Sequence, residues 1–521
     1  MCGIAGLFHC GTIKPVDPAR VERMSDALAH RGPDGSGLWT APGVGLGHRR
    51  LSIIDLAGST QPMHSADGRA VLVYNGEIYN YRELRRELAA LGAHFRTEGD
   101  SEVILAAWQQ WGADCLRRFN GMFAFAIYDR ERRELFLARD RLGVKPLYMA
   151  HLSDGSLAFA SELKGLLAHP LLRREIDPLA VEDYLTWGYV PDHRAILKGV
   201  EKLPAGHYRV LRHDTPPAAP VRWWDVSFAE RHKGKAADLE AELLHHLREA
   251  VTSRMVADVP LGAFLSGGVD SASVVALMAE ASREPVKTCT IGFDVAALDE
   301  TSYAEQVARL FATDHHARTV SADQFGELGT LAAMFDEPFA DASALPTWRV
   351  SQLARETVTV ALSGDGADEA FAGYRRQVFH AHEEQARRWL PPGLRRSVLG
   401  RLGAIYPKAD WAPRSLRLKT TLLSLAGSGA EGYARALSVT PPELRRPLYS
   451  VDFAREIGDY RAEDPLVRLM EGAPARSGLD RAQYADLTFW LPGDILTKVD
   501  RTSMAVSLEA REPLLDHRLI E

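Results

Sequence analysis

Short β-branched runs that alternate with helical stretches constrain the fold of the second half of this chain more than any other feature. The runs lie at 259–265, 287–293 and 357–362, and an amphipathic helix is predicted over 238–254. This alternation predicts a doubly wound parallel sheet of the α/β class. Residues 375–500 are rich in leucine, alanine and arginine and contain several prolines, which predicts a helical part with breaks. Ligands of such a sheet bind beyond the carboxyl ends of its strands.

The first half of the chain has a different pattern, in which short strands dominate. Strands are predicted at 44–55, 70–74, 122–129, 134–139 and 157–160. Two helices interrupt them, with predicted caps at Asn80 and Asp100 and ends at Gly92 and Gly112. We therefore predict an α+β lobe for this half.

A proline-rich stretch from Leu211 to Pro220 lacks an apolar period and separates the two regions. We place the domain boundary there. The prediction is a first domain over 1–210, a linker over 211–224 and a second domain over 225–521.

Composition excludes several classes of protein. The 62 basic and 69 acidic residues give a net charge of -7, so no basic excess indicates nucleic-acid binding. No apolar run approaches the roughly 18 residues of a membrane span, and the start lacks the features of a signal peptide. The four cysteines contain no C-x-x-C pair, which suits a reducing compartment without a disulfide framework. A folded cytoplasmic protein is expected.

Cys2 becomes the N-terminal residue if Met1 is removed. A free α-amine, with a reference pKa near ~7.7 to 8, then lies beside the thiol and can accept its proton. A second-position cysteine taken alone is ordinarily incidental. The motifs that follow Cys2 in the sequence therefore decide whether it is a nucleophile.

Four strings follow Cys2 in the first half: Arg31–Gly35, Arg50–Ile54, Asn75–Asn80 and Gly99–Val103. With Cys2, they resemble the class II (N-terminal nucleophile) glutamine amidotransferase domain, in its asparagine synthetase branch. The resemblance covers residues 1–210 and implies an αββα nucleophile-hydrolase sandwich.

The same motifs assign roles in glutamine hydrolysis. Cys2 is the expected nucleophile, and the Asn75 side chain and the Gly76 N–H are two donors for the oxyanion. By the resemblance, Arg50 binds the α-carboxylate of glutamine, while Asp100 and the Glu77 region bind its α-ammonium group. Arg50 and Asp100 could instead form a surface ion pair and a helix cap. The predicted glutamine-binding residues are Arg50, Leu51, Ser52, Ile53, Ile54, Asn75, Gly76, Glu77 and Asp100.

A second motif, Leu265–Ser271, lies where a predicted strand ends and a helix begins. Its glycines, serines and helix N-terminus suit an oxyanion, and Asp270 can bind magnesium. The Walker lysine is missing, so γ-phosphoryl hydrolysis is disfavoured. The loop resembles the pyrophosphate loop of the ATP pyrophosphatase superfamily, whose members adenylate a substrate.

Further loops support an adenylation site. Ser363–Glu369 presents Asp365, Asp368 and Glu369 after another strand, where three carboxylates favour a magnesium-nucleotide site. Asp365 is a predicted catalytic residue that stands where relatives usually have Glu. Asp270 and Asp368 are expected to bind Mg²⁺. The predicted ATP-binding residues are Leu265, Ser266, Gly267, Gly268, Asp270, Ser271, Ile291, Ser363 and Gly364.

The C-terminal motifs also resemble a synthetase domain. Lys498 and Arg501 are alternative candidates to bind pyrophosphate, although either could be a helix-surface cation. The stretch 339–346 lacks an arginine expected in some asparagine synthetases, and the chain stops at Glu521, where relatives continue. We expect the second domain to be incomplete at this end.

The resemblance implies an ATP-dependent carbon–nitrogen ligase that uses glutamine as amide donor. The expected substrates are glutamine, ATP and aspartate, and the expected product is asparagine; a different acceptor carboxylate, on a peptide or a sugar or secondary-metabolite precursor, is the alternative. A non-enzymatic regulator needs neither a nucleophile nor metal carboxylates, so Cys2, Asn75, Asp270 and Asp368 argue against it. No nucleic acid or membrane partner is expected, and a homodimer stays open.

Overall fold

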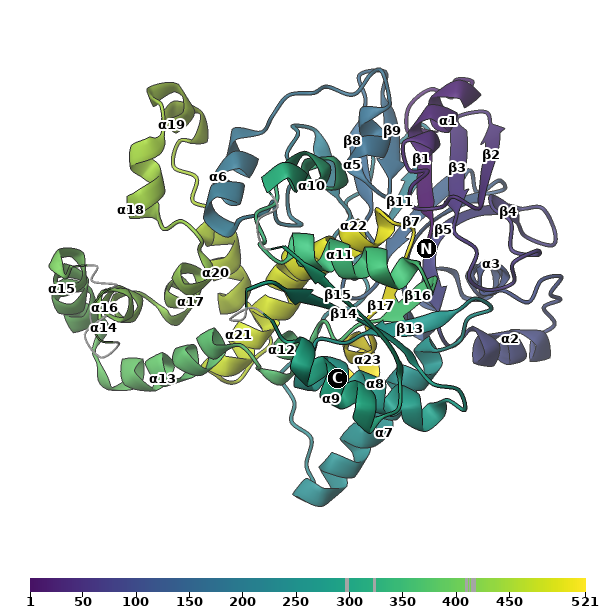
Figure 1. The fold of residues 1–521 in the computed structure, drawn as a ribbon. Helices are drawn as coiled ribbons and strands as arrows, with labels where there is room; N and C mark the ends of the chain where they lie inside the picture. The colour runs from purple at the N-terminus through teal and green to yellow at the C-terminus, as the bar shows by residue number, and fades with distance from the viewer. Residues whose placement is uncertain (296–298, 322–324, 408–410, 412, 414–417) are drawn as a thin grey trace.

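Two lobes lie against each other in the computed structural model of this chain (Figure 1). The structure describes residues 1–295, 299–321, 325–407, 411, 413 and 418–521.

Two six-stranded antiparallel sheets build the first lobe. The strands of the first sheet are β1 (Gly3–His9), β2 (Gly35–Ala41), β3 (Val44–Arg50), β8 (Tyr148–His151), β9 (Ser156–Ala160) and β10 (Val200–Lys202). Those of the second sheet are β4 (Met63–His64), β5 (Ala70–Ile78), β6 (Gly121–Asp129), β7 (Glu134–Arg139), β11 (His207–Arg212) and β12 (Val221–Arg222). The strand orders are β10-β8-β9-β1-β3-β2 and β12-β11-β7-β6-β5-β4.

Helices cover the outer face of each sheet, which confirms the αββα sandwich. The helices of this lobe are α1 (Pro18–Asp26), α2 (Tyr81–Ala90), α3 (Ser101–Trp111), α4 (Cys115–Arg118), α5 (Leu163–Leu167) and α6 (Pro178–Trp187). Strand β6 shows why both faces of the second sheet carry apolar side chains. Phe123 and Phe125 pack under α2 and α3, whereas Ala124 and Ala126 pack between the two sheets, because successive side chains of a strand point to opposite faces.

A five-stranded parallel sheet forms the centre of the second lobe, as predicted. Its strands are β13 (Leu261–Phe264), β14 (Lys287–Phe293), β15 (Asp314–Val320), β16 (Val360–Leu362) and β17 (Glu509–Arg511), in the order β15-β14-β13-β16-β17. The helices around it are α7 (Ala236–Arg254), α8 (Val269–Ala281), α9 (Thr301–Leu310), α10 (Leu328–Met334), α11 (Ala344–Arg355) and α22 (Leu496–Met504).

The strand order places a topological switch point beside β13. The chain passes from β13 outward through β14 and β15, and it then returns to the other side of β13 as β16. Helices α7, α8 and α9 pack on one face of the sheet, and α11 packs on the other. Loops that follow β13 and β16 therefore meet at one edge, where ligands of such sheets bind.

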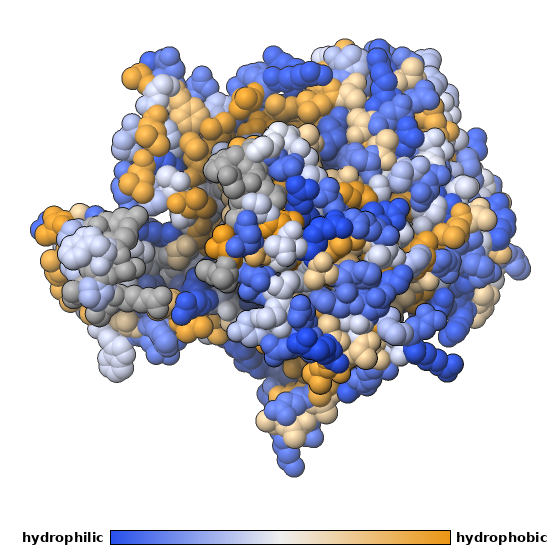
Figure 2. Space-filling model, in the orientation of Figure 1, coloured by the Kyte–Doolittle hydropathy of each residue, from blue (hydrophilic) through white to orange (hydrophobic). Residues whose placement is uncertain are grey.

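The rest of the second lobe is helical, as predicted. Its helices are α12 (Ala367–Phe371), α13 (Arg375–Trp389), α14 (Pro392–Leu394), α15 (Gly400–Ile405), α16 (Lys419–Ala426), α17 (Gly429–Leu437), α18 (Pro442–Arg445), α19 (Val451–Ile457), α20 (Glu463–Glu471), α21 (Gly478–Ala485) and α23 (His517–Ile520). Figure 2 shows apolar side chains gathered over α18 and α19, where Leu448 and Val451 are about three-quarters exposed, at 78% and 75%. No described helix is both long and apolar enough to cross a lipid bilayer.

The segment predicted as a linker, 211–224, has regular structure at both ends. Strand β11 extends to Arg212, and β12 adds to it as an edge strand of the first lobe. Trp223 is buried there and stacks against Phe123, with ring centroids 6.2 Å apart. The chain leaves the first lobe only after this tryptophan.

Candidate active sites

Cys2 directly precedes β1 and is buried beside the loop 51–54. Its backbone N–H donates to Asn75 Oδ1 at 2.9 Å, and its Sγ lies 3.9 Å from the carbonyl oxygen of Leu51. Burial raises the pKa of the Cys2 thiol, so the buried thiol keeps its proton unless a base accepts it. The nucleophile therefore requires an adjacent base.

Asn75 and Gly76 lie on β5 next to Cys2. The Asn75 side chain is fully buried, and its Nδ2 donates to no group of the described residues. The hydrogen bond from Cys2 sets the orientation of this amide, because it requires Oδ1 on that side. Gly76 has φ +153, and a Cβ there would lie 2.1 Å from the carbonyl oxygen of Met122. Only glycine fits this position, and the unpartnered Nδ2 is available for an oxyanion.

The loop that follows β3 forms another wall of this site. Arg50 is half-buried and donates to the carbonyl oxygens of Asp55 and Leu56 at 2.7 and 2.9 Å. The Ser52 N–H donates to Asp34 Oδ2 at 2.8 Å. Leu51 and Ile53 are buried, and Ile54 packs against the same core. Arg50 thus forms no ion pair with any residue that the structure describes, and its hydrogen bonds to main-chain oxygens leave its charge without a carboxylate partner there.

Asp100 and Glu77 form an acidic group on the same side of β5. Asp100 does not cap α3 with its side chain; it accepts from Tyr74 Oη at 2.8 Å and from the Ile78 N–H at 3.0 Å. Burial raises the pKa of both carboxyls, and Glu509 raises that of Glu77 further. Arg511 lies 3.6 Å from Glu77, but it also pairs with Glu509, so it compensates only part of the charge of these buried carboxylates. Such a group favours an ammonium ligand. The predicted side-chain cap at Asp100 was wrong, because this carboxylate accepts hydrogen bonds from Tyr74 and Ile78 of β5 instead.

The second lobe reaches this site through β17. The Met1 ammonium group donates to Glu509 Oε2 at 2.6 Å, and both groups are fully buried. Glu509 also accepts from Arg511 Nε at 2.7 Å, and Arg511 lies 3.6 Å from Glu77. The N-terminus and Arg511 hold the pKa of Glu509 at about 2 despite its burial. Sequence analysis did not find Glu509 or Arg511 as site residues.

The loop from Leu265 to Ser271 connects β13 with α8 at the switch point. Ser266 Oγ and Ser271 Oγ are 3.0 Å apart, and the Gly268 N–H donates to Ser266 Oγ at 3.3 Å. Gly267 has φ +82, and a Cβ there would lie 2.6 Å from Tyr303 Cβ. The glycines let the loop turn tightly into the N-terminus of α8, where backbone N–H groups suit an anion. Neighbouring β14 supplies Ile291, which is partly buried.

The loop after β16 packs directly against this first loop. A Cβ at Gly364 would lie 2.8 Å from the Ser271 nitrogen, so the two loops touch. Ser363 Oγ donates to Asp365. Burial raises the pKa of Asp270, and the nearby charges of Asp368 and Asp365 raise it further. The structure therefore brings Asp270, Asp365 and Asp368 close together. Glu369, the third carboxylate predicted after β16, instead accepts from Tyr374 Oη at 2.6 Å.

These carboxylates fit a magnesium ion that is shared with a nucleotide. The described residues contain no group of three His, Cys, Asp or Glu side chains arranged as a complete metal site. A nucleotide-bound Mg²⁺ needs only one or two carboxylates, because phosphates and waters complete its shell. Mutual repulsion of Asp270 and Asp368 is the charge pattern that a cation relieves.

Lys498 and Arg501 lie on α22 but point to different lobes. Lys498 Nζ donates to Ser343 Oγ at 2.8 Å and lies 3.1 Å from Asp341. Burial alone would lower the pKa of Lys498, but Asp365 and the other nearby carboxylates raise it. Arg501 instead donates to Asp500 at 2.5 Å in the interface between the lobes. Lys498 is therefore a better candidate than Arg501 to bind pyrophosphate.

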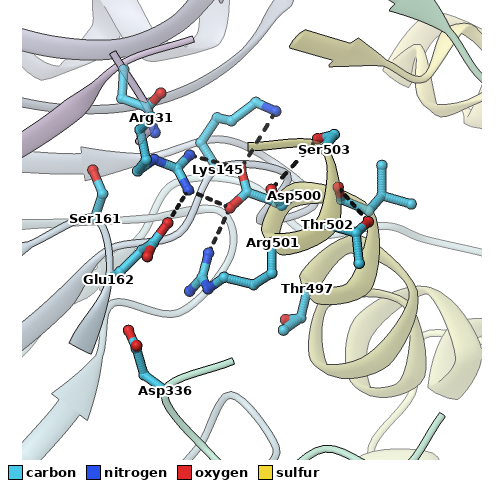
Figure 3. A network of polar contacts seen from close by, with 12 residues as sticks. Arg31, Lys145, Ser161, Glu162, Asp336, Thr497, Asp500, Arg501, Thr502 and Ser503 are labelled. Atoms are coloured by element: carbon cyan, nitrogen blue, oxygen red, sulfur yellow. Dashed lines mark hydrogen bonds and ion pairs between the residues drawn. The ribbon is translucent and has the colours of Figure 1, made fainter. Parts of the chain in front are cut away.

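Arg31 is the centre of an interface network that sequence analysis did not find (Figure 3). It donates to Glu162 at 2.5 Å and to both oxygens of Asp500 at 2.8 Å. Its Nε donates to the Cys2 carbonyl oxygen at 3.0 Å. Asp500 is 469 residues away in the chain, so no local pattern could indicate the pair. The only sequence signal was the position of Arg31 in a motif after Cys2.

Comparisons with known proteins match the two parts of the chain to different families. Residues 1–224 match a family described as a glutamine amidotransferase domain, and residues 242–521 match one described as asparagine synthase. A Mycobacterium tuberculosis protein, whose name contains the words asparagine synthetase (glutamine-hydrolyzing), is 38% identical over 95% of this chain and 76% of its own length.

Two other relatives cover nearly the whole chain. Asparagine synthetase (glutamine-hydrolyzing) 1 of Bacillus subtilis is 32% identical over 99% of this chain and 79% of its own length. A Penicillium rubens protein named amidase chyE is 29% identical over all of this chain and 82% of its own length.

Proposed function

Because the chain belongs to the glutamine-hydrolysing asparagine synthetase family, we propose that it transfers the amide nitrogen of glutamine to the side-chain carboxylate of aspartate at the expense of ATP. It is an ATP-dependent ligase with two reaction sites. The observation that carries the first site is the buried Asn75 Nδ2, which has no partner in the described chain. The Cys2 N–H donates to Oδ1 of the same amide and so fixes its orientation.

Glutamine hydrolysis begins at Cys2. After removal of Met1, the free α-amine accepts the thiol proton, and the thiolate attacks the side-chain carbonyl carbon of glutamine. Asn75 Nδ2 and the Gly76 N–H stabilise the oxyanion that forms. The C–N bond then breaks, ammonia leaves with a proton returned by the amine, and a thioester remains on Cys2. Water hydrolyses this thioester to glutamate.

The charged side chains around Cys2 are complementary to the α-carboxylate and the α-ammonium group of glutamine. Arg50 offers a cation for the α-carboxylate, and Asp100 with Glu77 offers an acidic group for the α-ammonium. Removal of Met1 also removes the ammonium group that now pairs with Glu509.

Adenylation occurs where the loops after β13 and β16 meet. One oxygen of the acceptor carboxylate attacks the α-phosphorus of ATP, and the bond to pyrophosphate breaks. The N-terminus of α8 and Lys498 bind the phosphate oxygens, while Asp270 and Asp368 would hold Mg²⁺, which neutralises phosphate charge. Ammonia then attacks the acyl carbon and releases AMP. Asp365, which accepts a hydrogen bond from Ser363 at this site, is the residue that we propose as acceptor of a proton from the attacking ammonia.

One observation favours the alternative of a larger acceptor. A cavity of about 670 Å³ opens beside Asp341, and its lining includes Phe335, Phe339 and Leu345. Lys498 is the adjacent cation, and it is already bonded to Asp341 and Ser343. Acidic residues, among them Asp336, also line the cavity, so its size rather than its charge supports a carboxylate on a bulkier molecule. Family membership supports aspartate.

The cysteines of the chain bear on its location. We propose that the enzyme works in the cytoplasm, because all four cysteines are free and buried.

Cys2→Ala tests the division into two sites. The variant should lose glutamine-dependent AMP formation and keep ammonium-dependent AMP formation, because its adenylation loops are unchanged. Loss of both reactions in a folded variant would contradict the proposal. Mass spectrometry of the active enzyme should show Cys2 as the first residue, and active enzyme that retains Met1 would rule out the amine as base.

A further inference from the structure

Helix α22 passes through the interface between the lobes, and its side chains reach both reaction sites. Lys498 extends toward Asp341 and the adenylation loops. Two residues later, Asp500 extends toward the first lobe and accepts two hydrogen bonds from Arg31. Figure 3 shows Asp500 and Arg501 projecting from this helix toward Arg31 and Glu162. One rigid element therefore carries groups of both sites.

Arg31 is held on three sides. Its Nη1 and Nη2 donate to Asp500 at 2.8 Å each, and Nη1 also donates to Glu162 at 2.5 Å. Its remaining nitrogen, Nε, donates to the Cys2 carbonyl oxygen at 3.0 Å. The side chains of Arg31 and Glu162 are fully buried, and that of Asp500 is 3% exposed. Water therefore cannot replace a lost partner without rearrangement of the interface.

The charges of the network support this geometry. Burial alone would raise the pKa of Asp500, but Arg31 and Arg501 lower it to about 2, so the carboxylate is ionised. Lys145 lies 4.0 Å away on the first lobe. Glu162 has other partners of its own, since His30 and Lys164 contact it. Asp500 is thus the contribution of the second lobe to the orientation of Arg31.

We propose that Asp500 is a positioning residue for glutamine hydrolysis. It holds Arg31 in place, and Arg31 in turn holds the main chain of Cys2 where the thiol can attack. The synthetase lobe thereby completes the glutaminase site without touching glutamine. This inference rests on the proposed role of Cys2 as the nucleophile.

Asp500→Asn changes this contact with little change of shape. An asparagine keeps one acceptor oxygen, but its Nδ2 would face a guanidinium nitrogen, and two donors cannot form a hydrogen bond. Arg31 would then shift toward Glu162 and away from the Cys2 carbonyl. A displacement of about 1 Å at a reacting group can cost about a hundredfold in rate.

Glu182→Gln is a matched control. Glu182 belongs to α6 of the first lobe and accepts from Arg445 Nε of the helical part at 3.0 Å. Both side chains are 1% exposed, so this ion pair is as buried as the one at Asp500 and also joins the two lobes. No hydrogen bond or ion pair that the structure shows for Glu182 and Arg445 involves Cys2 or Arg31.

The experiment compares the full-length wild type, Asp500→Asn, Asp500→Glu and Glu182→Gln. Glutamate release gives kcat and KM for glutamine, and AMP formation with ammonium reports the synthetase site. We expect Asp500→Asn to lower the glutaminase kcat at least about tenfold, with KM and the ammonium reaction within about twofold of wild type. Glu182→Gln should stay within about twofold in both reactions. Asp500→Glu keeps the negative charge, so its glutaminase kcat should fall less than that of Asp500→Asn.

Three results would overturn the proposal. The first is an unchanged glutaminase kcat in Asp500→Asn. The second is an equal loss of both reactions in Asp500→Asn, and the third is an equal effect of Glu182→Gln, since both indicate general loosening of the interface. If Asp500→Asn does not fold, Asp500→Glu decides by the same criteria. Absence of glutaminase activity in the wild type would instead refute the proposed function.

Discussion

Replacement of Asn75 by alanine should remove most of the stabilisation of the glutaminase transition state. The substitution deletes the buried Nδ2 donor and the Oδ1 that accepts from the Cys2 nitrogen at 2.9 Å. One oxyanion donor contributes about 2.7 to 4 kcal/mol, which corresponds to about 10² to 10³ in kcat. Loss of the hydrogen bond to Cys2 adds about 1 kcal/mol. The total of about 3.7 to 5 kcal/mol predicts a decrease in kcat of roughly 500- to 5,000-fold.

The assay follows glutamate release with and without ATP and acceptor. KM for glutamine should change much less than kcat, because the donor acts in the transition state. The same preparation should keep its AMP formation with ammonium, which also shows that it is folded. A decrease of less than about tenfold would mean that Asn75 is not an oxyanion donor.

Other predictions concern the remaining site and the stability of the interface. Asp270→Asn and Asp368→Asn should each suppress AMP formation while glutamate release continues, and formation of ADP and phosphate would refute adenylation. Gly76→Ala should abolish glutamate release, because its Cβ would lie 2.1 Å from a carbonyl oxygen; a variant near wild-type activity would refute the need for glycine. Glu512 directly follows β17 and lies near Lys145 of the first lobe, and its burial raises its pKa to about 7. The stability it contributes is therefore complete below its unfolded pKa near ~4.3 and is lost as pH rises through 7. Glu512→Gln should thus resist urea better than wild type at pH ~8, by up to about 3 kcal/mol, and less so at pH ~5; equal pH dependence of both proteins would contradict this.

Sequence patterns predicted strands that are largely buried on both faces. The predicted strands at 134–139 and 287–293 match β7 and β14 residue for residue. Strands β15 and β17 were not predicted. The first is an edge strand with exposed polar residues, and the second has only three residues, of which Glu509 and Arg511 are charged. Their pairing partners, rather than their own composition, make them strands.

Motifs indicated the loops of the candidate sites but not the groups that support them. The resemblance pointed to Asn75, Asp270 and Asp368, because each lies in a short and distinctive string of the sequence. The partners of Arg31 could not be predicted in this way. Asp500 lies in the other lobe, and a charged residue in a helix normally indicates a solvated surface. Only the folded chain shows that this surface is a buried interface.

The most direct test of the proposed function is a product balance with the full-length enzyme, glutamine, MgATP and aspartate. The proposed reaction forms asparagine, AMP, pyrophosphate and glutamate in equal amounts. AMP that forms only with another carboxylate, without asparagine, would show that the acceptor is not aspartate and would favour a larger molecule in the cavity beside Asp341. Formation of ADP, or no dependence of glutamate release on Cys2, would contradict the reaction itself.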